Sequence, residues 1–160
     1  MKRAFAQAQA RFHFAVIPHQ EALVKLLARR DLSESEARSR LGKLGIPGVE
    51  MEQALTWARS RGYLDDSRVA ENVMNKALSK EPPPARALVE NKLKDRGLRP
   101  ESVSALLNEA FAPGEQAGRL RKYLAKIGRT VKQSTLFGRL VRAGYTEDEI
   151  TDALEASYED

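Results

Sequence analysis

Two small groups of side chains are of types that suit acid–base or metal chemistry. Asp65, Asp66 and Glu71 are closely spaced carboxylates, and carboxylates bind hard cations or transfer protons. His13 and His19 offer imidazole nitrogens, but a spacing of six residues does not place them on one face of a helix. The chain contains no cysteine, which excludes a thiol nucleophile and a thiolate metal site.

A structural role explains the aspartates more simply than a catalytic one. Asp65 and Asp66 directly precede a helical pattern, where a carboxylate accepts hydrogen bonds from unpaired backbone N–H groups and favours the positive end of the helix. No histidine or nucleophile accompanies them, and no carboxylate completes a ligand set for the histidines. We therefore expect no metal, no cofactor and no catalytic residue, so that an enzyme is the weakest class of function.

Two further features resemble binding motifs only in part. Residues 42–48 are rich in glycine, but they lack the Gly-Lys-Ser/Thr ending of a phosphate-binding loop and follow a helix instead of a strand. Trp57 has the surface to stack on a base, yet its position three residues after Ala54 on an apolar stripe favours packing.

Basic residues are the stronger candidates for binding. Residues 119–142 hold eight basic residues and no acid, whereas residues 147–160 hold seven acids and no base. A dipolar segment of this kind suits an acidic partner or nucleic acid, although a solvated helix face remains the alternative. The candidate partner-binding residues are Arg119, Lys122, Lys126 and Arg129, and as second choice Arg38, Arg40 and Lys43.

A repeated pattern shows how these residues are positioned. Residues 41–55, 93–107 and 140–154 share one template: Leu, three residues, Gly, an apolar residue, four residues, an apolar residue, three residues, Leu. Such a glycine suits the left-handed residue that ends a helix, and the following apolar spacing predicts a second helix. The glycines of the three copies are Gly45, Gly97 and Gly144.

The repeat predicts an all-α protein, an elongated tandem array of three three-helix units. We expect these units at residues 19–62, 63–112 and 113–160, preceded by an N-terminal extension, residues 1–18, that is helical. Capping boxes are expected at Ser33 with Glu36, Thr130 with Gln133, and Thr146 with Glu149. The three prolines of residues 82–84 should separate two helices of the middle unit.

Composition limits the compartment and the assembly. The absence of cysteine fits a reducing compartment, and no apolar run is long enough to span a bilayer, so we expect a cytoplasmic protein without a membrane partner. The acid-poor start leaves an organellar transit peptide as an alternative to the extra helix. We expect a monomer, because repeated units satisfy one another.

The chain resembles the RecX family of bacterial proteins over roughly residues 20–158. The resemblance lies in four segments, namely 27–33, the Gly-Tyr-Leu-Asp-Asp of 62–66 with Val69 and Ala70, 93–98 and 140–145. The proline-rich residues 81–84 depart from the basic, glycine-containing segment that is usual at this place in the family.

The resemblance implies a non-enzymatic regulator of the RecA recombinase. Such a regulator binds the recombinase filament on DNA and inhibits its ATP hydrolysis, strand exchange and coprotease activity. DNA is then contacted directly or through the filament. The resemblance supplies no catalytic residue, and it marks Asp65 and Asp66 only as a structural motif. The alternative that the cations leave open is a stand-alone nucleic-acid-binding helical repeat.

Overall fold

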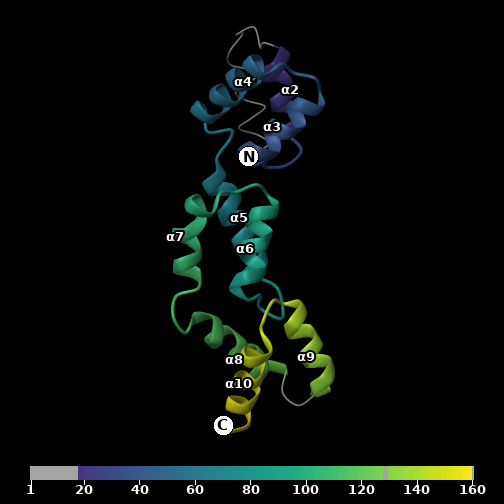
Figure 1. The fold of residues 1–160 in the computed structure, drawn as a ribbon, viewed down its shortest axis with the longest axis vertical. Coiled ribbons are helices and arrows are strands. Elements are labelled where there is room, and N and C mark those ends of the chain that lie inside the picture. Colours follow the sequence, from purple (N-terminus) through teal and green to yellow (C-terminus); the bar gives the residue numbers. More distant parts are fainter. Residues whose placement is uncertain (1–17, 128–129, 160) are drawn as a thin grey trace. The chain divides into compact units, whose positions relative to one another are not determined.

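The computed structural model describes residues 18–127 and 130–159, and that part of the chain consists of α-helices joined by turns, without a β-strand (Figure 1). The helices are α2 (Pro18–Leu27), α3 (Glu34–Lys43), α4 (Gly48–Ser60), α5 (Asp66–Leu78), α6 (Arg86–Asp95), α7 (Pro100–Ala110), α8 (Glu115–Ile127), α9 (Gln133–Arg142) and α10 (Glu147–Glu159). The predicted all-α class is confirmed. The helix expected within residues 1–17 lies outside the described residues.

The chain divides into two compact units, Met1–Val69 and Ala70–Asp160. The first unit contains α2, α3, α4 and the start of α5, and the second contains the rest of α5 and all later helices. The division into three repeated units stays a prediction.

The repeated glycines end helices as their spacing predicts. Gly45, Gly97 and Gly144 follow α3, α6 and α9 with φ angles of 75°, 69° and 92°, in the left-handed region that favours glycine. The residue after each glycine turns back, since the N–H groups of Ile46, Leu98 and Tyr145 donate to carbonyls of Leu41, Leu93 and Leu140. The first leucine of each repeat therefore receives the hydrogen bond that closes its turn.

The predicted capping boxes form at α3 and α10. Ser33 accepts from the backbone N–H of Glu36 at 3.1 Å, and Glu36 accepts in return from the N–H of Ser33 at 3.0 Å. Thr146 and Glu149 make the same reciprocal pair, at 3.3 and 2.8 Å. Each box satisfies backbone donors that the first turn of the helix leaves open.

The capping box predicted at Thr130 is wrong. The Thr130 hydroxyl donates to the carbonyl of Ile127 at 2.6 Å, so it serves the end of α8. Helix α9 begins only at Gln133, with Lys132 as N-cap and no side-chain cap. A threonine hydroxyl can donate to an unpaired carbonyl at the end of one helix or accept from an unpaired N–H at the start of the next. The local sequence pattern does not show which of the two bonds forms.

The core of the first unit consists of apolar side chains from α2, α3 and α4 and from the two short segments that precede α3 and α5. These buried residues are Leu23, Leu32, Ala37, Leu41, Ala54, Leu55, Ala58 and Leu64. Trp57 and Tyr63 pack against this core, with ring centroids 5.5 Å apart at 62°. This edge-to-face contact agrees with the packing role expected for Trp57.

In the second unit the proline-rich segment packs on the turn after α9. The backbone N–H of Ala85 donates to the carbonyl of Ala143 at 2.9 Å, and the Tyr145 hydroxyl donates to the carbonyl of Pro83, also at 2.9 Å. Ala85 is buried in the same apolar cluster as α8, α9 and α10. The prolines separate α5 from α6 as predicted, and the carbonyl of Pro83 and the N–H of Ala85 hold the start of α6 against the turn that follows α9.

Candidate binding surface

The sequence-predicted cations of the second unit lie on α8, whose buried face consists of Leu120, Tyr123 and Leu124. Lys122 and Lys126 lie on the exposed remainder of this helix. Arg129 lies outside the described residues. The helix therefore presents cations to solvent on the side opposite its packing stripe, which the 3.6-residue period predicts.

Arg119 is not the exposed cation that we expected. Its side chain is only 24% exposed, and its guanidinium carbon lies 4.8 Å from the centre of the Phe111 ring. Its Nη1 pairs with Glu115 at 3.5 Å, whereas Nε and Nη2 are buried without a hydrogen-bond partner among the described residues. The cation–π contact and the burial make Arg119 part of the packing between α7 and α8, and its role in binding a partner stays a prediction.

The two exposed lysines of α8 differ in their contacts. Lys126 Nζ lies 2.5 Å from the Glu81 carboxylate, which ties α8 to the segment before α6. Lys122 makes no ion pair or side-chain hydrogen bond to another described residue. Of the predicted binding residues on α8, Lys122 is therefore the most available to a partner.

The three second-choice cations of the first unit lie on α3. Arg38 pairs with Glu52 and, at 3.3 Å, with Glu34, and Glu34 also accepts from Arg59 at 2.9 Å. This network joins α3 to α4 on the surface and occupies Arg38. Arg40 is half-buried and Lys43 is exposed, and neither side chain is paired within the described part of the chain.

A pocket of the second unit is lined by four cations. The sequence analysis did not predict that these four side chains lie together. Lys80 follows α5, Lys92 lies on α6, and Arg139 and Arg142 lie on α9. The pocket has a volume of about 290 Å³. The two arginines belong to the basic stretch 119–142, whereas the two lysines come from the middle of the chain, where acidic and basic residues balance. The four side chains come together only because residues 83–85 pack against the end of α9.

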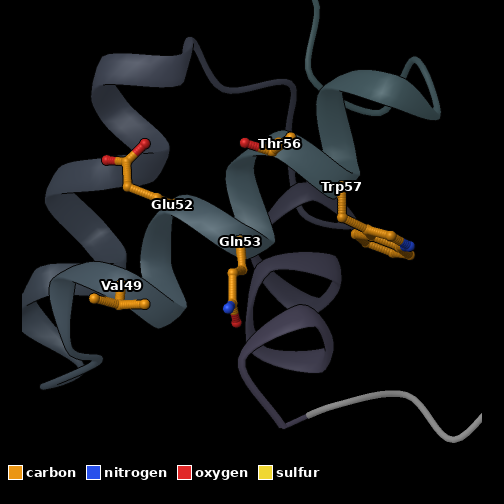
Figure 2. Close-up of a pocket in the computed structure, with 5 residues that line it drawn as sticks. All are labelled: Val49, Glu52, Gln53, Thr56 and Trp57. Atoms are coloured by element: carbon orange, nitrogen blue, oxygen red, sulfur yellow. The ribbon is translucent and has the colours of Figure 1, made fainter.

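An open hollow on α4 has a different chemistry. Figure 2 shows the side chains that line it along successive turns of this one helix, namely Val49, Glu52, Gln53, Thr56 and Trp57. Val49 is 73% exposed. The hollow contains no histidine or second carboxylate, and its one acid is already paired with Arg38.

The aspartates of the Gly-Tyr-Leu-Asp-Asp motif are helix caps. Asp65 accepts from the backbone N–H groups of Ser67 and Arg68 at 3.0 and 3.2 Å, at the start of α5. Asp66 accepts instead from the N–H of Glu34 at 2.8 Å, at the start of α3. Asp65 thus caps the helix that follows it, whereas Asp66 caps α3 and not the helix that we expected. In the described residues no group of three or more acidic, histidine or cysteine side chains is placed to hold a metal ion.

Two remaining expectations concern the histidines and the membrane. His19 is 8% exposed on α2, and His13 lies outside the described residues. Across residues 18–127 and 130–159, none of the helices has the length and apolar character needed to cross a bilayer.

The chain is similar to two curated proteins over most of its length. It is 28% identical over 141 residues to the regulatory protein RecX of Cronobacter sakazakii, a match that covers 78% of this chain and 84% of that protein. It is 28% identical over 142 residues to the regulatory protein RecX of Trichlorobacter lovleyi, covering 84% of this chain and 92% of that protein. No family model matches the sequence.

The fold is similar to that of a solved structure that carries the same name as the two curated relatives. The crystal structure of RecX from Lactobacillus salivarius superposes with a TM-score of 0.69 and covers 89% of this chain and 96% of that one, at 14% sequence identity. The name that the two curated relatives share is that of a regulatory protein and names no enzymatic activity. With two relatives matched over most of the sequence and the fold in agreement, the chain is similar to the RecX regulatory proteins in both sequence and fold.

Proposed function

We propose that this protein regulates the RecA recombinase by binding the recombinase filament on DNA. The observation that carries the proposal is the match to two regulatory proteins of one name over about four fifths of the chain. The regulation is negative: it lowers the ATPase, strand-exchange and coprotease activities of the filament. The protein acts as a monomer in the cytoplasm.

The helical units supply the surface for such binding. A chain of small helical units presents contacts over many residues, and contacts distributed in this way suit a filament with a repeating surface. Among the predicted partner-binding residues, Lys122 in the second unit and Lys43 in the first are exposed and have no ion-pair partner within the described part of the chain. We expect these two lysines to contact the acidic filament.

The test is the ATPase activity of the cognate recombinase on single-stranded DNA, titrated with this protein at moderate salt. Direct binding of the protein to the same DNA is measured in parallel, in the same buffer. We expect inhibition at concentrations far below those that coat the free DNA.

The alternative function is a stand-alone nucleic-acid-binding protein, which the excess of basic over acidic residues favours. Under that alternative, inhibition begins only when the DNA is saturated, because the two proteins compete for one substrate. The salt dependence of direct DNA binding then accounts for the whole effect, and the regulator proposal is rejected.

A further inference from the structure

The pocket between α5, α6 and α9 combines four cations with almost no opposing charge. Lys80, Lys92, Arg139 and Arg142 make no ion pair or side-chain hydrogen bond to another described residue. The pocket's single acid, Glu81, is bound to Lys126. Four like charges around one pocket repel each other, and folding has brought them together without an internal counterion.

The pocket is formed before any ligand arrives. Its apolar part comes from Ala77, Leu88 and Ala143, and the carbonyl of Ala143 holds the N–H of Ala85 at 2.9 Å. Gly144 permits this close approach, because a Cβ at that position would lie 2.8 Å from the Cβ of Leu88. Lys92, Arg139 and Arg142 thus project from α6 and α9, two helices that are held against each other within the second unit, and this lowers the entropy cost of binding.

The types and spacing of the cations indicate the chemistry of the ligand. Arg139 and Arg142 are three residues apart and lie on the same side of α9, and guanidinium groups bind phosphate oxygens in a bidentate manner. Lys80 and Lys92 add point charges from two other elements. The lining contains no aromatic side chain on which a base would stack, so the pocket recognises the backbone and not the bases.

We propose that this pocket binds the phosphodiester backbone of a nucleic-acid strand, without regard to base sequence. An acidic protein surface is less suited, because carboxylates occur at irregular spacing, whereas a strand supplies a phosphate at every nucleotide and matches the protein's net charge of +5. The assignment rests on the pocket and holds with or without the recombinase.

Fluorescence anisotropy of a labelled mixed-sequence single-stranded DNA, measured without recombinase over a range of salt concentrations, tests the site. The variant is Arg139→Gln with Arg142→Gln. A strand contact contributes about 0.7 to the slope of log K against log salt, so losing two contacts should lower the slope by about 1.4 and weaken binding. Lys80→Gln with Lys92→Gln, on two other elements, should give the same change.

The matched control is Arg29→Gln with Arg61→Gln. Both residues are exposed and lie outside the pocket, and the control removes the same charge from the chain. It should change the slope far less than either pocket variant. Equal slopes for the pocket and control variants, at unchanged helicity and melting temperature, would refute the assignment.

Two other outcomes would also overturn the site. No anisotropy change with the unaltered protein would show that the pocket does not bind nucleic acid, while ATPase inhibition, measured separately, would still decide the regulator proposal. Unchanged DNA binding by the pocket variants combined with lost inhibition of the recombinase would show that the pocket binds an acidic protein surface instead.

Discussion

Asp66, on the first turn of α5, accepts a hydrogen bond from the backbone N–H of Glu34 at 2.8 Å, and so caps a helix that begins 32 residues earlier. Its neighbour Asp65 caps its own helix. Two adjacent carboxylates thus serve two helices, and Asp66 ties the start of α5 to the first unit.

Because Asp66 and Ser33 cap the same helix, their effects on stability should be coupled. Asp66→Ala and Ser33→Ala should each lower the free energy of unfolding by about 1 kcal/mol. In the double variant the two losses should not add, since both remove caps from the first turn of α3. Urea denaturation of the single and double variants measures the coupling.

The control cycle pairs Ser33→Ala with Asp65→Ala, because Asp65 caps α5. These two losses should add to within about 0.5 kcal/mol. Additivity in both cycles would contradict the cross-helix cap.

Substitution of glycine by alanine should have three different outcomes along the chain. At Gly144 alanine meets both an unfavourable φ of 92° and the Leu88 side chain, so we expect a loss of roughly 2–4 kcal/mol. At Gly45 no atom lies within 4 Å of an added Cβ, so alanine there meets only the cost of the left-handed backbone, about 1–2 kcal/mol. Gly118 lies inside α8 with free space, and alanine there should stabilise by about 0.5–1 kcal/mol.

Thermal and urea unfolding of these three variants give the order. A Gly144→Ala variant as stable as Gly45→Ala would show that residues 83–88 do not press against the turn after α9.

Tyr145 should make stability fall in alkaline solution. Burial raises the pKa of Tyr145 to about 12, while Arg119 lowers this pKa and Glu149 raises it further. Between about pH 10 and pH 12 the unfolded chain loses the phenolic proton and the native state keeps it, so stability declines with rising pH, by at most roughly 2–3 kcal/mol.

Tyr145→Phe isolates this contribution. Near neutral pH the variant should be less stable by about 1 kcal/mol, because the carbonyl of Pro83 loses its donor. Above pH 10 the gap should narrow and then reverse, since phenylalanine does not ionise. Urea denaturation at pH 8 and pH 11.5 provides the comparison, and parallel pH curves for the two proteins would argue against the buried phenol.

Lys122→Glu should weaken inhibition of the recombinase more than Lys94→Glu. Both lysines are exposed in the second unit and neither side chain has a partner among the described residues, so the two variants change the net charge equally. We expect at least a several-fold rise in the concentration for half-inhibition of the ATPase for Lys122→Glu, with an unchanged melting temperature. Equal effects of the two variants would remove α8 from the binding surface.

The local part of this fold was predictable from the sequence. A left-handed glycine and a capping box each depend on residues within one turn, so the spacing around Gly45 or Ser33 is sufficient. Thr130 marks the limit of this reasoning. Its hydroxyl could accept from the helix after it or donate to the helix before it, and it donates to the carbonyl of Ile127 at the end of α8.

The contacts between distant segments were not predictable. No spacing rule relates Asp66 to Glu34, or Pro83 to Tyr145, because such pairs depend on how the helices pack. The candidate surface shows the same limit. The charge pattern identified α8 as a basic helix, but the contact of Arg119 with the Phe111 ring depends on tertiary structure. The pocket lined by four cations depends on it as well.

The hydrogen bond from Ala85 to Ala143 also offers a natural reporter of motion. Ala85 is the N-cap of α6, so its N–H makes no hydrogen bond within that helix, and its acceptor is the carbonyl of Ala143, the C-cap of α9. Exchange of this one amide therefore records each opening between the proline segment and α9, whether or not any helix unfolds.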